Sequence, residues 1–123
     1  MNGISVMIDT NIAIALLNGD EKLAEMFDAK DVHISFITEL ELLCKPGMKI
    51  SEKRDIQSFL DDCTILEINS SIKEITISIR QFHKIKLPDA IIAATCIFWN
   101  LPFFTRDDDF KSIKGLNCFF VNF

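Results

Sequence analysis

Short apolar segments rich in β-branched residues alternate along this chain with longer segments whose apolar residues recur at helical spacing. The segments that predict strands are residues 4–8, 32–36, 64–68, 102–105 and 116–121. Ile72, Ile75 and Ile79 illustrate the other pattern, because their spacing places them on one face of a helix. Alternating strands and helices favour a parallel sheet with helices on both of its faces.

The predicted helices are bounded by capping and breaking residues. We expect a helix over 12–17, one capped by Asp20, one from Thr38 to the break at Pro46-Gly47, and one capped by Ser51. Two further helices are expected over 70–83 and from Leu87-Pro88 to Trp99. The last of these is apolar almost all round, which predicts that it is central and buried.

Length and composition restrict the class of protein. The 123 residues, 49% of them hydrophobic and 25% charged, predict one globular domain, 1–123. No apolar run approaches the roughly 20 residues of a membrane span, and no signal peptide is recognised at Met1, so we expect a cytoplasmic protein. The four cysteines form no C-x-x-C pair, and reduced thiols are expected. The net charge of −5 argues against binding to nucleic acid through phosphate contacts alone.

The carboxyl ends of the strands predict where a site lies, because open α/β sheets bind ligands at that edge. The polar segments that follow strands are Asp9-Thr10-Asn11, Thr38 to Glu41, and Thr105 to Asp109. Asp9 has a structural alternative as the N-cap of the next helix. Glu41 has one too, because Thr38 and Glu41 form a T-x-x-E capping box.

Asp89 and the triplet Asp107-Asp108-Asp109 complete the candidate carboxylates. Asp89 follows Pro88 in a first helical turn, where acids are common, but its sequence neighbours are apolar and a buried carboxylate needs a partner or a cation. Three adjacent acids repel one another, and a cation would relieve that repulsion. A solvated turn is the structural alternative for the triplet.

The resulting set is acidic. Asp9, Glu41, Asp89 and Asp107 stand with Asn11 and Thr105 as polar companions, and neither histidine has a partner at metal-ligand spacing. Carboxylates without His or Cys suit Mg²⁺ or Mn²⁺. Such ions activate water and neutralise phosphate, which indicates phosphodiester hydrolysis.

Four sequence blocks hold the candidate acids, occur in order and span residues 4–110. They are Met7-Ile8-Asp9-Thr10-Asn11, the segment 35–42, the segment 87–95 that begins Leu87-Pro88-Asp89, and the segment 101–110. Together these blocks resemble the PIN domain family and, within it, the VapC-like toxin ribonucleases.

The resemblance implies a small Rossmann-like α/β/α sandwich and a Mg²⁺- or Mn²⁺-dependent endoribonuclease. It implies that Asp9, Glu41, Asp89 and Asp107 bind metal, with Asp109 as a competitor for the fourth position and Asn11 and Thr105 in support. It also implies a small antitoxin partner that inserts into the active-site groove, and a homodimer.

Three basic residues near these blocks are candidate RNA phosphate contacts: Lys84, Lys86 and Arg106. The alternative is that these are ordinary solvated surface side chains. Three other functions stay open: a PIN fold without catalysis that serves as a binding scaffold, a phosphatase with Asp9 as nucleophile, and a receiver-like signalling domain. The phosphatase lacks its second acid, because Asn11 stands there, and the receiver lacks an acid pair after the first strand.

Overall fold

The computed structural model describes residues 3–123, which form five strands, six α-helices and one 3-10 turn. In chain order these are β1 (Ser5–Ile8), α1 (Thr10–Leu17), α2 (Glu21–Phe27), β2 (Asp31–Ser35), α3 (Phe36–Leu43), α4 (Ile50–Asp61), β3 (Thr64–Leu66), α5 (Ser70–Phe82), α6 (Leu87–Trp99), β4 (Phe103–Thr105), η1 (Asp108–Phe110) and β5 (Cys118–Phe120). The alternation predicted from sequence is confirmed.

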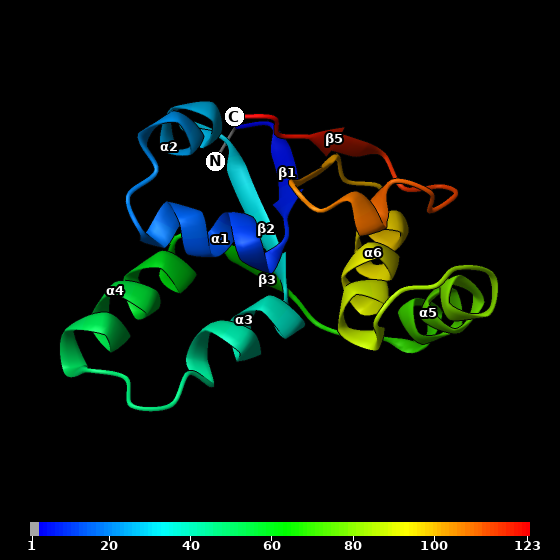
Figure 1. Ribbon diagram of the computed structural model, residues 1–123, viewed down its shortest axis with the longest axis horizontal. Coiled ribbons are helices and arrows are strands. Elements are labelled where there is room, and N and C mark those ends of the chain that lie inside the picture. Colours follow the sequence, from blue (N-terminus) through cyan, green and yellow to red (C-terminus); the bar gives the residue numbers. More distant parts are fainter. Residues whose placement is uncertain (1–2) are drawn as a thin grey trace.

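All five strands of the described chain run parallel, in the order β3-β2-β1-β4-β5. The strand order reverses at β1, because the chain builds outward through β2 and β3 and then returns to add β4 and β5. Helices α1 to α4 lie on one side of the sheet and α5 and α6 on the other (Figure 1). The predicted α/β class and parallel sheet are therefore confirmed.

Successive residues of β1 point into two different hydrophobic cores, as the two-residue period of a strand requires. Val6 and Ile8 pack with α1, α2 and α4, whereas Met7 packs with α5 and α6. All three side chains are at most 1% exposed. A strand buried on both faces has to be apolar throughout, which explains the uninterrupted apolar run at this position.

Three helix starts differ from the predictions. Helix α1 begins at Thr10, two residues before the expected start at residue 12, with Asp9 as its N-cap. Helix α3 begins at Phe36 with Ser35 as its N-cap, so Thr38 is buried inside the helix and the predicted capping box is wrong. Helix α4 begins at Ile50 with Lys49 at the N-cap, so Ser51 lies within its first turn. Asp9 and Ser35 accept hydrogen bonds from first-turn amides of α1 and α3, whereas Lys49 makes no side-chain capping bond at the start of α4. The apolar pattern fits either start of each helix and could not separate them.

Helix α6 is central, as predicted, but its ends are not buried. Ala90 and the segment 92–96 are buried, while Leu87 and Trp99 are 52% and 50% exposed. No helix among residues 3–123 combines the length and apolarity that crossing a membrane requires.

Candidate active site

The pairing of β1 with β4 brings Asp9 and Thr105 together. Ile8 is in register with Phe104, so the next residue on each parallel strand lies at the same sheet edge. Asp9 caps α1 by accepting a hydrogen bond from the Ile12 amide at 2.9 Å, and its other carboxylate oxygen accepts one from the Thr105 hydroxyl. The capping interpretation of Asp9 is thus confirmed, and it uses only one of the two oxygens.

Thr105 connects Asp9 to Asp107. The Thr105 hydroxyl accepts a hydrogen bond from the Asp107 amide at 2.9 Å while it donates to Asp9. Thr105 is fully buried and Asp9 is 4% exposed. The Asp107 side chain in turn caps η1 by accepting from the Asp109 amide at 2.9 Å. The chain that follows β4 is therefore folded back so that Asp107 faces the end of β1.

Two threonines hold Glu41 at the same edge. The Thr10 hydroxyl donates to Glu41 Oε1 at 2.5 Å and lies 3.0 Å from the Thr38 hydroxyl. Thr38 is fully buried, whereas Glu41 is exposed, one helical turn further along α3. These contacts fix the Glu41 carboxylate beside the start of α1.

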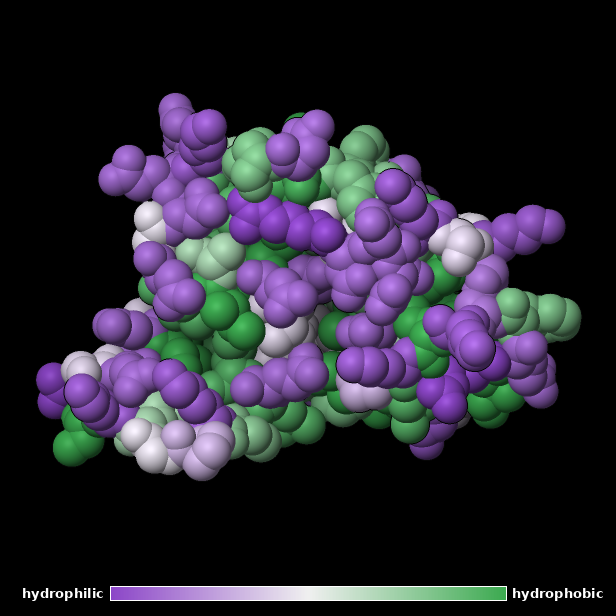
Figure 2. Space-filling view, in the orientation of Figure 1, coloured by the Kyte–Doolittle hydropathy of each residue, from purple (hydrophilic) through white to green (hydrophobic). Residues whose placement is uncertain are grey.

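The four predicted carboxylates line one cleft of about 380 Å³. Its walls are residues from α1, α3, α6 and the turn after β4: Asp9, Thr10, Asn11, Ile14, Glu41, Lys86, Pro88, Asp89, Asp107 and Phe110. In Figure 2 this region lies near the centre of the drawn face, among mainly hydrophilic side chains. The cleft sits outside the carboxyl ends of the strands, next to β1, as the switch-point rule predicts.

The charges in the cleft repel one another. The pKa of Asp89 is raised above its ordinary 3.8, first by burial and then by the charges of Asp107, Glu41 and Asp9, and only Lys86 opposes this. Burial also raises the pKa of Asp9, although its bonds to Thr105 and Ile12 work in the other direction. Like charges that disfavour each other's ionised form create a place that favours a cation.

In the positions they occupy, the carboxylates of the cleft do not form a complete set of metal ligands. Among residues 3–123, no three His, Cys, Asp or Glu side chains are arranged so that they could hold a metal ion as they stand. Asp9, Glu41 and Asp107 each also accept a hydrogen bond from the protein itself. The donor set nevertheless fits Mg²⁺ or Mn²⁺, since it consists of carboxylate oxygens whose mutual repulsion a divalent ion would relieve.

The other predicted residues separate into two groups. Asn11 and Lys86 line the carboxylate cleft. Asp109 and Lys84 line a neighbouring cavity instead, so Asp107, not Asp109, faces the cleft. Arg106 lies outside both linings and pairs with Asp20 at 3.3 Å and with the main-chain oxygen of Phe123.

The sequence assigned Thr10 no role of its own and Thr38 only that of a helix cap, so their part in the site was missed. Both follow predicted strands, but the contact between them joins residues 28 positions apart. A threonine directly after the strand-end acid was the available signal, and capping preferences explain that residue type equally well.

Comparison with known proteins identifies the family. The PIN domain family model matches residues 6–116. A toxin–antitoxin complex from Klebsiella pneumoniae contains a chain 33% identical to this one, with a TM-score of 0.79, covering 90% of this chain and 94% of that one. No curated protein sequence matches significantly.

Two further solved structures share the fold. A chain of VapBC2 from Rickettsia felis, bound to a DNA fragment from its promoter, has a TM-score of 0.83 at 21% identity, covering 97% of this chain and 100% of that one. A chain of DNA-bound VapBC from Salmonella typhimurium has a TM-score of 0.81 at 22% identity, covering 95% of this chain and 98% of that one.

These findings, with the parallel sheet and the acidic cleft at its strand ends, define a small α/β protein with a PIN domain fold. The chain belongs to the PIN domain family. Its fold is that of the VapC-like members, so the resemblance seen in the sequence blocks is confirmed.

Proposed function

We propose that this protein is a divalent-metal-dependent endoribonuclease and the toxin of a toxin–antitoxin pair. The observation that carries the proposal is the single cleft into which four carboxylates from four parts of the chain converge, with the pKa of Asp89 raised by its burial and by the charges of the other three. Its membership of a family of nucleases supports the hydrolase class. Its similarity to a chain of a toxin–antitoxin complex supports the pairing.

Asp9, Asp89, Asp107 and Glu41 are the residues that would hold Mg²⁺ or Mn²⁺. A bound ion of this kind lowers the pKa of a water molecule and stabilises charge on phosphate oxygens. Thr105 keeps Asp9 oriented and Thr10 keeps Glu41 oriented through the bonds described above. In this proposal Glu41, the most exposed of the four, would orient the attacking water, and Lys86, which also lines the cleft, would hold a phosphate.

An apolar groove supports an antitoxin partner. A cavity of about 440 Å³ lies between α1, α3 and α4, with Ile14, Leu17, Leu42 and Ile56 among its lining residues. Figure 2 shows hydrophobic side chains gathered over these helices. Ile14 and Glu41 line both this groove and the carboxylate cleft, so a helical segment bound in the groove would reach the site. We include homodimerisation and a cytoplasmic location in the proposal as expectations from the family.

The decisive experiment is cleavage of a mixed RNA pool, beside a single-stranded DNA pool, by the purified protein with Mg²⁺, with Mn²⁺ and with EDTA. The variants are Asp9→Asn and Asp89→Asn, with Glu74→Gln on the exposed side of α5 as a matched control. We expect metal-dependent RNA cleavage that both Asn variants lose and the control keeps.

Other results would redirect the function. Full metal-dependent cleavage by Asp9→Asn would overturn the site assignment. Metal binding by calorimetry without cleavage of either pool would indicate a binding scaffold. A phosphorylated or fluoroberyllate-trapped Asp9 would indicate a phosphatase.

A further inference from the structure

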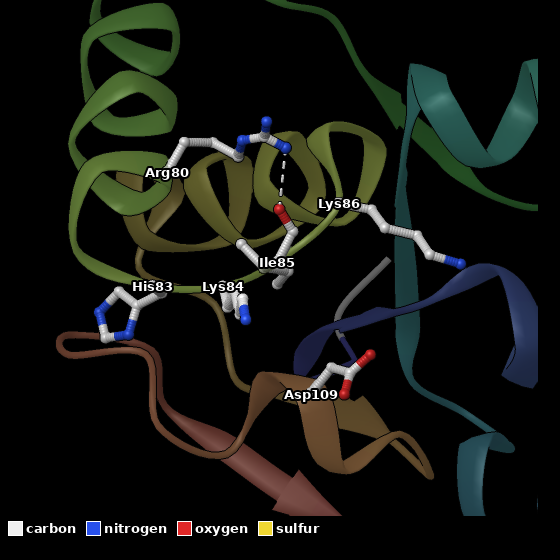
Figure 3. A pocket seen from close by; sticks show the side chains of 6 residues that line it. All are labelled: Arg80, His83, Lys84, Ile85, Lys86 and Asp109. Carbon is white, nitrogen blue, oxygen red and sulfur yellow. Dashed lines mark hydrogen bonds between the residues drawn. The ribbon is translucent and has the colours of Figure 1, made fainter.

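A third cavity, distinct from the carboxylate cleft and the apolar groove, is basic. It has a volume of about 480 Å³ and is lined by Arg80, His83, Lys84, Ile85, Lys86 and Asp109 (Figure 3). Three cations and a histidine thus line it beside a single carboxylate, in a protein whose net charge is −5. The stretch from Ile75 to Pro88 contains these cations and no acidic residue, so the positive charge is local and concentrated.

The cations of this cavity are available to a ligand. The ion pairs among residues 3–123 are Lys45–Glu52, Arg106–Asp20 and Lys111–Asp108, and none of them uses Arg80, Lys84 or Lys86. All three of these side chains are exposed. Unpaired cations around a concave surface are the usual protein feature for holding phosphate groups.

The connection between α5 and α6 is held in place by its own contacts. The side chain of Ile85 is buried in the core, and its carbonyl oxygen accepts a hydrogen bond from Arg80 Nη1 at 2.9 Å. Because Ile85 points inward, its neighbours Lys84 and Lys86 project outward, which Figure 3 shows. A connection fixed in this way presents its cations without a further cost of ordering the backbone.

Lys86 joins the two sites. It lines both the basic cavity and the carboxylate cleft, and in Figure 3 its amine extends away from the cavity toward α1. Asp107 lines the cleft and Asp109 lines the basic cavity, so the turn after β4 also borders both. A polynucleotide whose scissile phosphate lies among the four carboxylates would therefore pass Lys86 and enter the basic cavity.

We infer that the basic cavity formed by Arg80, His83, Lys84 and Lys86 binds a phosphate group of the RNA strand adjacent to the one that is cut. The inference rests on the proposed function, because it assigns the path of the same substrate. It gives Lys84 and Arg80 a positioning role, whereas the chemistry belongs to the carboxylate cleft. It also explains how an acidic protein holds a polyanion.

The test is RNA affinity without cleavage. A fluorescently labelled single-stranded RNA oligonucleotide of mixed sequence is titrated in EDTA over a series of salt concentrations, with wild type, Lys84→Ala, Asp109→Asn and Lys53→Ala. Lys53 is the matched control, since it is exposed on α4, on the opposite side of the sheet (Figure 1). Each phosphate contact contributes roughly 0.7 to the slope of log affinity against log salt for a single strand.

We expect Lys84→Ala to weaken binding several-fold and to lower that slope by about 0.7, with no change for Lys53→Ala. Asp109→Asn removes the only carboxylate of the cavity lining and is expected to tighten binding. Equal effects of Lys84→Ala and Lys53→Ala would overturn the inference, as would no gain from Asp109→Asn or no measurable RNA binding by the wild type.

A cleavage assay separates this inference from the proposed function. Both the subsite and the nuclease are supported if the wild type cleaves RNA with Mg²⁺ or Mn²⁺ and the Lys84→Ala variant has a higher KM and an unchanged kcat. Cleavage by the wild type with no loss of affinity in Lys84→Ala overturns the subsite and keeps the nuclease. The expected pattern of affinities without any cleavage keeps the subsite and overturns the nuclease.

Discussion

At the scale of single residues, the site depends on one hydroxyl that serves two partners. Thr105 donates to Asp9 and accepts from the Asp107 amide, and it does so from a fully buried position. Buried polar groups that lose a partner cost free energy, so the pair of bonds both stabilises the fold and orients two of the four acids. The geometry of the cleft therefore depends on a residue that does not itself line it.

Thr105→Val is expected to lower the free energy of unfolding by about 1–3 kcal/mol, because it leaves Asp9 and the Asp107 amide without their buried partner. Metal-dependent cleavage should fall by roughly 10–100-fold, as for other residues that orient metal ligands. Thr105→Ser keeps the hydroxyl and serves as the control. Urea unfolding and initial cleavage rates measure the two effects, and equal behaviour of Val and Ser variants would contradict the role.

The charge of Asp89 predicts a pH dependence of stability. Its pKa is raised in the folded protein, so the native state holds the proton more tightly than the unfolded chain. The free energy of unfolding therefore falls as the pH rises from the ordinary value of 3.8 through the raised one, and stays lower at neutral pH. Asn at position 89 has no proton to lose and stays neutral, so Asp89→Asn escapes this fall.

Without metal at pH 7, Asp89→Asn is thus expected to unfold at higher urea concentration than wild type, with a gain below about 1 kcal/mol because Asp89 is only half-buried. The difference should disappear near pH 3. Glu74→Gln controls for loss of any one carboxylate. A variant less stable than wild type at pH 7 would show that Asp89 is not repelled by its neighbours.

At the scale of secondary-structure elements, capping residues decide which side chains of α3 face the cleft. The Ser35 hydroxyl accepts a hydrogen bond from the Ile37 amide at 3.0 Å. The helix therefore begins at Phe36, two residues before the predicted start at Thr38. That start places Thr38 inside the helix, where its hydroxyl meets Thr10. Glu41 is consequently held by Thr10, and its capping alternative is excluded.

Ser35→Ala is expected to cost about 1 kcal/mol of stability through loss of the N-cap. Ser51→Ala should be nearly neutral, because α4 begins at Ile50 and Ser51 is an exposed residue in its first turn. Thermal or urea unfolding of the two variants compares them directly. A large loss of stability in Ser51→Ala with none in Ser35→Ala would show that the helices begin where the sequence predicted.

At the scale of the whole molecule, two hydrophobic cores flank one sheet. The reactivity of a buried thiol measures how often the core around it opens. Burial raises the pKa of Cys96 to about 12, and Cys96 is 1% exposed on α6, whereas Cys44 is exposed after α3. Only the thiolate reacts with alkylating reagents. Cys96 is therefore expected to react only when the core opens.

Under native conditions at pH 8, iodoacetamide should modify Cys44 rapidly and Cys96 at the rate of global opening. Peptide mass spectrometry follows the two sites. Phe103→Leu, which thins the same core, should accelerate Cys96 and leave Cys44 unchanged. Comparable rates at both thiols in the wild type would show that this core is not closed.

The sequence by itself determined the order of strands and helices, the parallel sheet and the candidate acids. It could do so because burial on both sheet faces demands apolar strands, and because helical spacing and strand ends are local patterns. The predicted starts of α1, α3 and α4 were wrong because the apolar pattern does not define the first turn of a helix, and the residues that cap α1 and α3 are the earlier Asp9 and Ser35.

Only the tertiary structure decided which of these residues meet. Placing β4 beside β1 brings Thr105 to Asp9 across 96 residues, and folding η1 back turns Asp107 toward the cleft and Asp109 toward the basic cavity. The same folding draws Arg106 to Asp20 and away from both linings. Such contacts depend on strand order and on the packing of distant segments, which no local pattern of side chains encodes.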